Sequence, residues 1–174
     1  GLTHLQYVVS VSNTHSQHNA GASTDDAIAA FEAIAGPMID QGAVMEMTLS
    51  TAFGCPYEQR IDPERVVEVA RRVVDAGASS IGLADTIGVA IPSEVASLVS
   101  AVAQSVDASL LAHLHYTRCL ALSNGLAPPG AGANRLVAPV RVLVCCPFAP
   151  GASGYVALEG VAHAIEATGG ATGC

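Results

Sequence analysis

The sequence has no lysine: the seven basic side chains among its 174 residues are all arginine. A Schiff-base aldolase, a pyridoxal phosphate enzyme and a P-loop nucleotide site each need a lysine amine, so these three classes are excluded. Basic residues are also scarce, and the formal net charge is −8 at pH 7. Without a basic stripe, nucleic-acid binding is not expected.

Long apolar runs are lacking too, although hydrophobic residues make up 51% of the chain and charged residues only 13%. No run reaches the roughly 18 apolar residues needed to cross a membrane. The apolar content is instead typical of parallel strands that are buried on both faces. No basic stretch followed by an apolar one marks a targeting segment at the N-terminus. The five cysteines are odd in number and form no CxxC pair. We therefore expect a reducing compartment, either the cytoplasm or, in a eukaryote, the mitochondrial matrix.

The length fits one domain over residues 1–174, in which strands and helices alternate. Short β-branched or apolar runs predict strands at 6–12, 43–50, 79–84, 108–115 and 136–144. Apolar residues at helical spacing, preceded by cap-type residues or proline, predict helices at 24–39, from Pro63 to Gly77, from Pro92, from near Thr117, and at 156–168.

Five β–α units of this size predict an α/β fold with a parallel sheet and helices outside it. A closed barrel of eight units needs about 250 residues. The sequence therefore predicts either a small open sheet or part of a TIM barrel that comprises its five C-terminal units.

Polar residues follow the predicted strands, where parallel α/β folds place their ligands and catalytic groups. These strand ends are Asn13-Thr14-His15, Ser50-Thr51, Asp85-Thr86, His113-Leu114-His115 and Cys145-Cys146.

His113 and His115 are two residues apart on one strand, so their side chains are expected on the same side of the sheet. Two imidazoles at the mouth of a sheet can hold one divalent cation. The alternative is a pair of hydrogen-bonded histidines in a polar rim.

Asp85 and Cys146 are further candidates for proton transfer. Asp85 ends a strand, where its carboxylate could accept a proton or anchor a metal-bound water; the alternative is a cap for the next helix. Cys146 lies in a loop of small residues that could present a thiol to a pocket, although an isolated thiol is more often buried and inert. Cys55 could line a ligand entrance or simply pack in a turn. His4, His18 and His163 are expected at the surface.

The segments 12–24, 50–92, 112–118 and 146–154 resemble the hydroxymethylglutaryl-CoA lyase family in order and spacing. These segments include SNTHSQHNAGAST, FGCPYEQ, ADTIGVAIP, AHLHYTR and CPFAPGASG. The two Cys-Pro-aromatic motifs distinguish this family from the isopropylmalate and homocitrate synthases.

The resemblance implies a TIM-barrel lyase that cleaves 3-hydroxy-3-methylglutaryl-CoA to acetyl-CoA and acetoacetate with Mg²⁺ or Mn²⁺, a reaction of leucine degradation and ketone body metabolism. By similarity, His113 and His115 are metal ligands, Cys146 protonates the thioester enolate, and Asp85 assists proton transfer. The implied partner is an acyl-CoA substrate.

Several positions depart from the family pattern. The first strand of the family, with its Arg-Asp pair, has no counterpart. Tyr155 replaces an expected asparagine ligand, and Tyr116 replaces an aspartate. With two imidazoles remaining, a hard cation is expected to bind weakly.

The sequence leaves three alternatives open: a lyase that is active when another chain supplies the missing strands, a non-catalytic remnant or fragment, and a module that binds acyl-CoA or metal. In each, uncovered sheet edges predict self-association or a need for a complementing N-terminal segment.

Overall fold

The computed structural model describes residues 3–133, 135–137 and 156–172. Its elements are β1 (His4–Ser10), α1 (Asn13–Ala20), α2 (Thr24–Asp40), β2 (Val44–Ser50), α3 (Pro63–Asp75), β3 (Ser80–Asp85), α4 (Pro92–Ala103), β4 (Ser109–Leu114), α5 (Ala121–Leu126), α6 (Pro128–Ala131), β5 (Arg135–Val137) and α7 (Leu158–Ala167). The alternation predicted from the sequence is confirmed.

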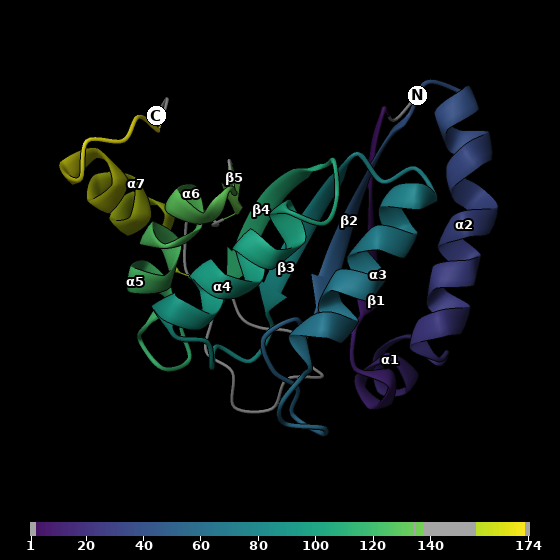
Figure 1. The fold of residues 1–174 in the computed structure, drawn as a ribbon, viewed down its shortest axis with the longest axis horizontal. Helices are drawn as coiled ribbons and strands as arrows, with labels where there is room; N and C mark the ends of the chain where they lie inside the picture. The colour runs from purple at the N-terminus through teal and green to yellow at the C-terminus, as the bar shows by residue number, and fades with distance from the viewer. Residues whose placement is uncertain (1–2, 134, 138–155, 173–174) are drawn as a thin grey trace.

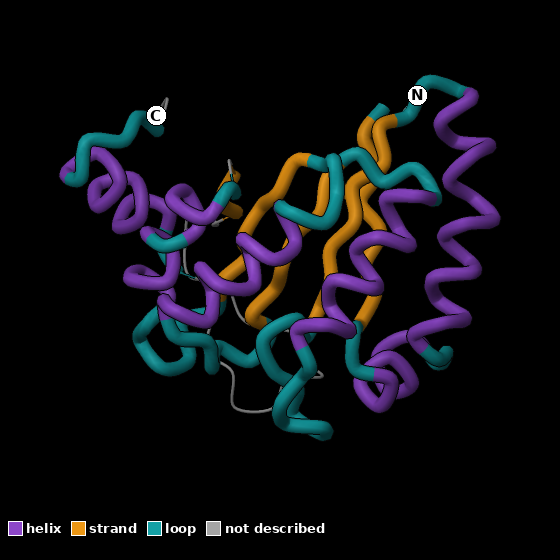
Figure 2. The backbone as a smooth tube through the Cα atoms, in the orientation of Figure 1, coloured by secondary structure: helices purple, strands orange, loops and turns teal. Residues whose placement is uncertain are grey.

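The strands form one parallel sheet in the order β1-β2-β3-β4-β5. Each connection along the chain therefore leads to the neighbouring strand, as in the wall of a barrel. Helices α2, α3 and α4 lie against one face of the sheet (Figures 1 and 2). The carboxyl ends of all strands meet at a single edge, which gathers the polar strand ends predicted above.

Local sequence signals explain where the long helices begin. The Ser23 side chain caps α2 by accepting a hydrogen bond from the backbone N–H of Asp26, at 3.0 Å. The Asp62 side chain caps α3, and Pro63 follows in its first turn. Proline also opens α4 at Pro92. A side-chain cap satisfies an N–H that has no partner within the helix, and proline removes one such N–H.

The main core lies between the sheet and this helix layer. The apolar stripe predicted for α4 is confirmed, because Val95, Leu98, Val99 and Val102 are all buried. In α3 the buried stripe is Val66, Val69, Ala70 and Val73. From the sheet, alternate residues point into the same core: Met45, Met47 and Leu49 of β2, Ile81 and Leu83 of β3, and Leu110, Ala112 and Leu114 of β4.

The opposite face of the sheet, here called the open face, carries many polar residues and is most exposed along β1. Its residues alternate with the core residues along the same strands, for example Glu46, Thr48 and Ser50 of β2. Val8 on the edge strand β1 is 50% exposed. The expectation of strands buried on both faces therefore holds for β3, which is buried throughout, and is wrong for β1.

The structure refines the sequence predictions at several places. The segment after the first strand forms a helix, α1, which has no apolar periodicity to reveal it. The helix predicted at 24–39 is confirmed as α2, which contains Pro37 and ends at Asp40. The helix expected from Thr117 begins at Ala121, and Pro128 opens the separate short helix α6. The fifth strand spans Arg135–Val137 in the described residues, and 138–144 lie outside them.

Candidate active site

A cavity of about 260 Å³ opens on the open face at the carboxyl ends of the strands. Its lining comes from strands β1 to β4, helix α1 and the segments after β3 and β4. It consists of Gln6, Val8, His15, Asn19, Thr48, Ser50, Ala84, Thr86, His113 and His115. Most of these side chains carry a hydrogen-bonding group, and three are imidazoles. Such a polar cavity at this edge of a parallel sheet is where α/β folds bind their ligands.

His113 and His115 lie side by side in this cavity, which confirms their predicted placement on one side of the sheet. The two ring centroids are 5.3 Å apart, and the ring planes meet at 70°. Burial, and then the charge of neighbouring His115, lower the pKa of His113 to about 4 from its ordinary 6.5. Burial also lowers the pKa of His115, against the opposing effects of Thr86 and Asp85. Both rings are therefore neutral at neutral pH, the form that binds a metal.

A backbone carbonyl orients the ring of His115. Its Nδ1 forms a hydrogen bond with the carbonyl oxygen of Thr86. Because a carbonyl oxygen can only accept, Nδ1 carries the proton and Nε2 carries the lone pair. This is the arrangement by which proteins fix a histidine for metal binding through its other nitrogen.

Thr86 also ties the cavity to β2. Its hydroxyl oxygen accepts a hydrogen bond from the backbone N–H of Thr51 at 2.7 Å and lies 3.0 Å from the hydroxyl oxygen of Ser50. Thr51 itself has a φ of 59°, in the left-handed region that a β-branched residue rarely adopts. Strain of this kind is held in place by surrounding contacts and concentrates at functional sites.

Asp85 lies on the other side of the strand from the cavity. It follows Ile81 and Leu83 at alternate positions and is fully buried. Its carboxylate oxygens accept hydrogen bonds from the backbone N–H groups of Val89 at 2.9 Å and Ala90 at 3.1 Å. Burial raises its pKa, against the opposing effect of these hydrogen bonds.

The alternative considered for Asp85, a cap for the next helix, is not what forms: its carboxylate bonds the loop before α4, and Ile91 occupies the N-cap position of that helix. Asp85 shapes the loop of residues 85–91 and does not line the cavity. Gly88 in this loop has a φ of +63°, and a Cβ built there would lie 2.6 Å from the Thr117 hydroxyl oxygen. The loop thus packs closely on the segment that follows His115.

His15 follows a strand end in the sequence, and the structure places it in the cavity. Helix α1 turns the ring back towards β1, where Nδ1 lies 2.7 Å from the hydroxyl oxygen of Ser10. The residue is 1% exposed. Burial, followed by His18, lowers its pKa, while Glu58 has the opposite effect. Two signals in the sequence concern His15: its position at a strand end, and Ser12 as the cap of a helix that lacks apolar periodicity.

The described residues provide two of the predicted site residues in the cavity. Cys146 and Tyr155 lie outside the described residues. In residues 3–133, 135–137 and 156–172, no three His, Cys, Asp or Glu side chains converge as a metal site.

The remaining sequence candidates have structural roles or lie at the surface. Cys55 packs in a turn: its thiol donates to the hydroxyl oxygen of Ser12 at 2.9 Å, and the sulfur accepts from the N–H groups of Tyr57 and Glu58. His4, His18 and His163 are exposed as predicted, and the ring of His18 stacks on Tyr57. None of the helices in the described part of the chain has both the length and the apolar character needed to cross a bilayer.

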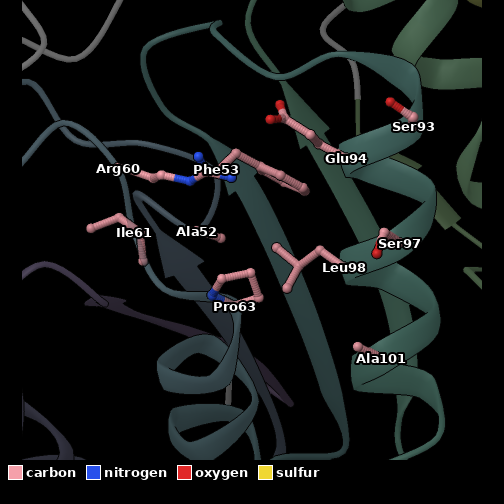
Figure 3. Close-up of a pocket in the computed structure, with 10 residues that line it drawn as sticks. All are labelled: Ala52, Phe53, Arg60, Ile61, Pro63, Ser93, Glu94, Ser97, Leu98 and Ala101. Atoms are coloured by element: carbon pink, nitrogen blue, oxygen red, sulfur yellow. The ribbon is translucent and has the colours of Figure 1, made fainter.

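A second cavity, of about 280 Å³, lies between the segment after β2 and helix α4 (Figure 3). Arg60 and Glu94 are its charged residues. Glu94 is already engaged at the start of α4, where its carboxylate accepts a hydrogen bond from the N–H of Ile91 at 3.3 Å. The two cavities share no lining residue, and only the first contains imidazoles.

Comparison with known proteins identifies the family. A family described as HMGL-like matches residues 1–174. The chain belongs to the HMGL-like family. Its relatives in this family include (R)-citramalyl-CoA lyase of Chloroflexus aurantiacus, 33% identical over 99% of the chain and 55% of the relative. The cytoplasmic 3-hydroxy-3-methylglutaryl-CoA lyase of Danio rerio is 36% identical over 99% of the chain and 52% of the relative.

Solved structures of HMGL-like proteins share the fold. The HMG-CoA lyase of Brucella melitensis superposes with a TM-score of 0.92 at 30% identity, covering 98% of this chain and 61% of that one. An HMG-CoA lyase of Acinetobacter baumannii in complex with coenzyme A and 3-methylmalate gives 0.87 at 34% identity, covering 96% and 55%. The five-stranded sheet is thus part of a TIM barrel, as predicted. The chain spans about half the length of the curated relatives it matches.

Proposed function

We propose that the chain carries the metal-binding part of the active site of a carbon–carbon lyase whose substrate is a 3-hydroxy-3-methyl acyl-CoA thioester. The observation that carries the proposal is the pair of neutral, buried imidazoles at the barrel mouth, one of them oriented by the Thr86 carbonyl. Family membership supports the reaction type.

The side chains present fit a divalent cation at His113 and His115. Both rings are neutral at neutral pH, and the tautomer of His115 directs a lone pair away from Thr86. A bound Mg²⁺ or Mn²⁺ would act as a Lewis acid towards hydroxyl and carboxylate oxygens of the substrate. With two protein ligands in the described region, we expect the cation to be held weakly and to keep several waters.

In the proposed reaction, a base removes the proton of the 3-hydroxyl group, and the C2–C3 bond breaks as that oxygen becomes a carbonyl. The electron pair of the broken bond forms a thioester enolate, which a proton donor converts to acetyl-CoA. Cys146 is our proposed donor, by its match to the family's cysteine. Asp85 contributes indirectly, because it holds the loop that presents the Thr86 carbonyl to His115.

The relatives differ in the substrate they name, and the two substrates differ by one methylene group. Cleavage of 3-hydroxy-3-methylglutaryl-CoA gives acetyl-CoA and acetoacetate, whereas the same bond cleavage in citramalyl-CoA gives acetyl-CoA and pyruvate. We propose the former as the substrate, because the sequence motifs resemble that lyase.

An assay of purified protein with each thioester, with Mg²⁺ or Mn²⁺, tests the proposal by measuring both keto acids. Acetoacetate formation that is lost in His113→Ala supports it. Pyruvate formation would instead indicate that citramalyl-CoA is the substrate. If calorimetry shows that coenzyme A binds but no turnover occurs, the alternative of an acyl-CoA-binding module is favoured. If neither binding nor turnover occurs, a non-catalytic remnant is favoured.

We also propose that the open edge of β1 is covered in an active protein. Val8 is half exposed on this edge strand, and the curated relatives are about twice as long as this chain. An unpaired edge beside an uncovered face favours association. Mixing the chain with the portion of a relative that it does not match should restore activity, and light scattering of the chain alone should show oligomers. A stable, active monomer would contradict this proposal.

A further inference from the structure

His15 is an almost completely buried imidazole whose second nitrogen has no hydrogen-bond partner. The residue is 1% exposed, and Nε2 is among the buried polar atoms without a partner. Burying such a nitrogen is unfavourable unless it is satisfied. Because His15 lines the cavity, a ligand bound there could supply the partner.

The ring is held firmly from its other side. Nδ1 lies 2.7 Å from the hydroxyl oxygen of Ser10, and the backbone N–H of His15 donates to the Ser12 hydroxyl oxygen at 3.0 Å. Ser10 ends the edge strand and is paired in register with Ser50, whose hydroxyl reaches Thr86. A ring fixed in this way presents Nε2 in one direction at little cost in conformational entropy.

His15 shares a cavity with the proposed metal-binding pair but does not join it in a cluster of three ligands. It lines the same cavity as His113 and His115. Nevertheless, no three metal-ligating side chains converge in the part of the chain that the structure describes. His15 is therefore placed to meet the organic part of a ligand that the pair holds through a cation.

We propose that His15 is a substrate-binding residue whose Nε2–H donates a hydrogen bond to an oxygen atom of the acyl group, with Ser10 as its positioning residue. The proposal rests on the lyase function proposed above. When the Ser10 hydroxyl donates to Nδ1, the neutral ring carries its proton on Nε2, as this role requires. Oxygen atoms are the acceptors that a 3-hydroxy-3-methyl acyl thioester offers at its hydroxyl, carboxylate and carbonyl groups.

Two substitutions at this position test the contacts of the two ring nitrogens separately. His15→Asn places an amide near the position of Nδ1 and leaves nothing at Nε2, so the contact with Ser10 is retained and the proposed contact is lost. His15→Gln places an amide nitrogen near the position of Nε2. We expect roughly tenfold weaker binding of 3-hydroxy-3-methylglutaryl-CoA for His15→Asn and a smaller loss for His15→Gln. Free coenzyme A has no acyl group, and its binding should be unchanged in both variants.

Nitrogen NMR of the ¹⁵N-histidine-labelled wild-type protein makes the test independent of variant folding. 3-Hydroxy-3-methylglutaryl-CoA is added with Mg²⁺, and acetoacetate is followed in the same tube so that spectra precede cleavage. The proposal predicts that the Nε2 resonance of His15 moves together with those of His113 and His115. Movement of His113 and His115 while His15 stays unchanged would overturn the role of His15 and leave the lyase proposal standing. If none of the three moves, the proposed function fails, and the role of His15 fails with it.

Discussion

The two faces of the sheet are built from the same strands and differ in polarity and in what covers them. On the helix-covered face, β4 contributes Leu110, Ala112 and Leu114 to the hydrophobic core. On the open face the same segment presents His113 and His115 to a polar cavity. The period of two along a strand thus separates the residues that stabilise the fold from those that bind a ligand. Substitutions on the first face should change stability, and substitutions on the second should change binding.

The largest difference in the loss of stability is expected between Phe31→Ala and Val8→Ala. Phe31 of α2 is fully buried against the sheet and packs on Tyr7, with ring centroids 5.4 Å apart. Its truncation should lower the free energy of unfolding by about 3–5 kcal/mol. Val8 on the open face is 50% exposed, and its truncation should cost less than about 0.5 kcal/mol. Urea unfolding of both variants measures the difference; equal losses would contradict the division between the faces.

Acid should destabilise the metal-free chain, because His113 on the open face is partly buried in its neutral form. Burial and His115 lower the pKa of His113 to about 4 from 6.5, so between these values the unfolded chain binds a proton that the folded chain does not. Stability is therefore retained above pH 6.5 and lost as the pH falls towards 4, by at most about 3 kcal/mol from this group. Unfolding measured across this range should show a clearly smaller slope in His113→Asn. An unchanged slope would show that other groups cause the acid sensitivity.

Asp85→Asn should have an intermediate effect, because it removes one of two buried hydrogen bonds and leaves the core packing intact. The amide retains one acceptor oxygen and loses the other, so either the Val89 or the Ala90 N–H loses its partner. We expect a loss of about 1–2 kcal/mol in the free energy of unfolding. The exposed Asp107 provides the control, and Asp107→Asn should be neutral. Asp85→Asn with wild-type stability would mean that these hydrogen bonds do not hold the loop.

The smallest effect is expected for the ion pair on the open face. Arg135 of β5 contacts Glu46 of β2 at 2.6 Å, with Arg135 half exposed, and this guanidinium is the main cause that lowers the pKa of Glu46. Exposed pairs contribute about 0–1 kcal/mol and are screened by salt. Glu46→Gln should therefore lower the melting temperature slightly at low ionic strength and not at high salt. A large loss that persists in salt would show that the pair supports the open face more strongly than its exposure indicates.

Much of the fold could be predicted from the sequence because its signals are local. Ser23, Pro63 and Pro92 mark helix starts, and the i,i+2 spacing of His113 and His115 gives their shared side. Helix α1 was missed because its cap is followed by polar residues only, and no apolar stripe marks it.

The site was harder to predict because its contacts join distant segments. The role of His15 depends on Ser10 at the end of β1, and the orientation of His115 depends on a carbonyl 29 residues earlier. The position of Asp85 could have been inferred: it continues the alternation of Ile81 and Leu83, so its carboxylate belongs to the helix-covered face. Cys146 and Tyr155 stay predictions from resemblance.

Mn²⁺ binding is the most direct measurement of the central claim that His113 and His115 form a cation site on the open face. Electron paramagnetic resonance of free Mn²⁺ in a titration should give one weak site per chain in the wild-type protein. Affinity should fall at least roughly tenfold in His115→Ala and remain unchanged in His163→Ala, a histidine on the exposed side of α7. Mn²⁺ binding that is equal in all three proteins, or absent from all three, would contradict the account.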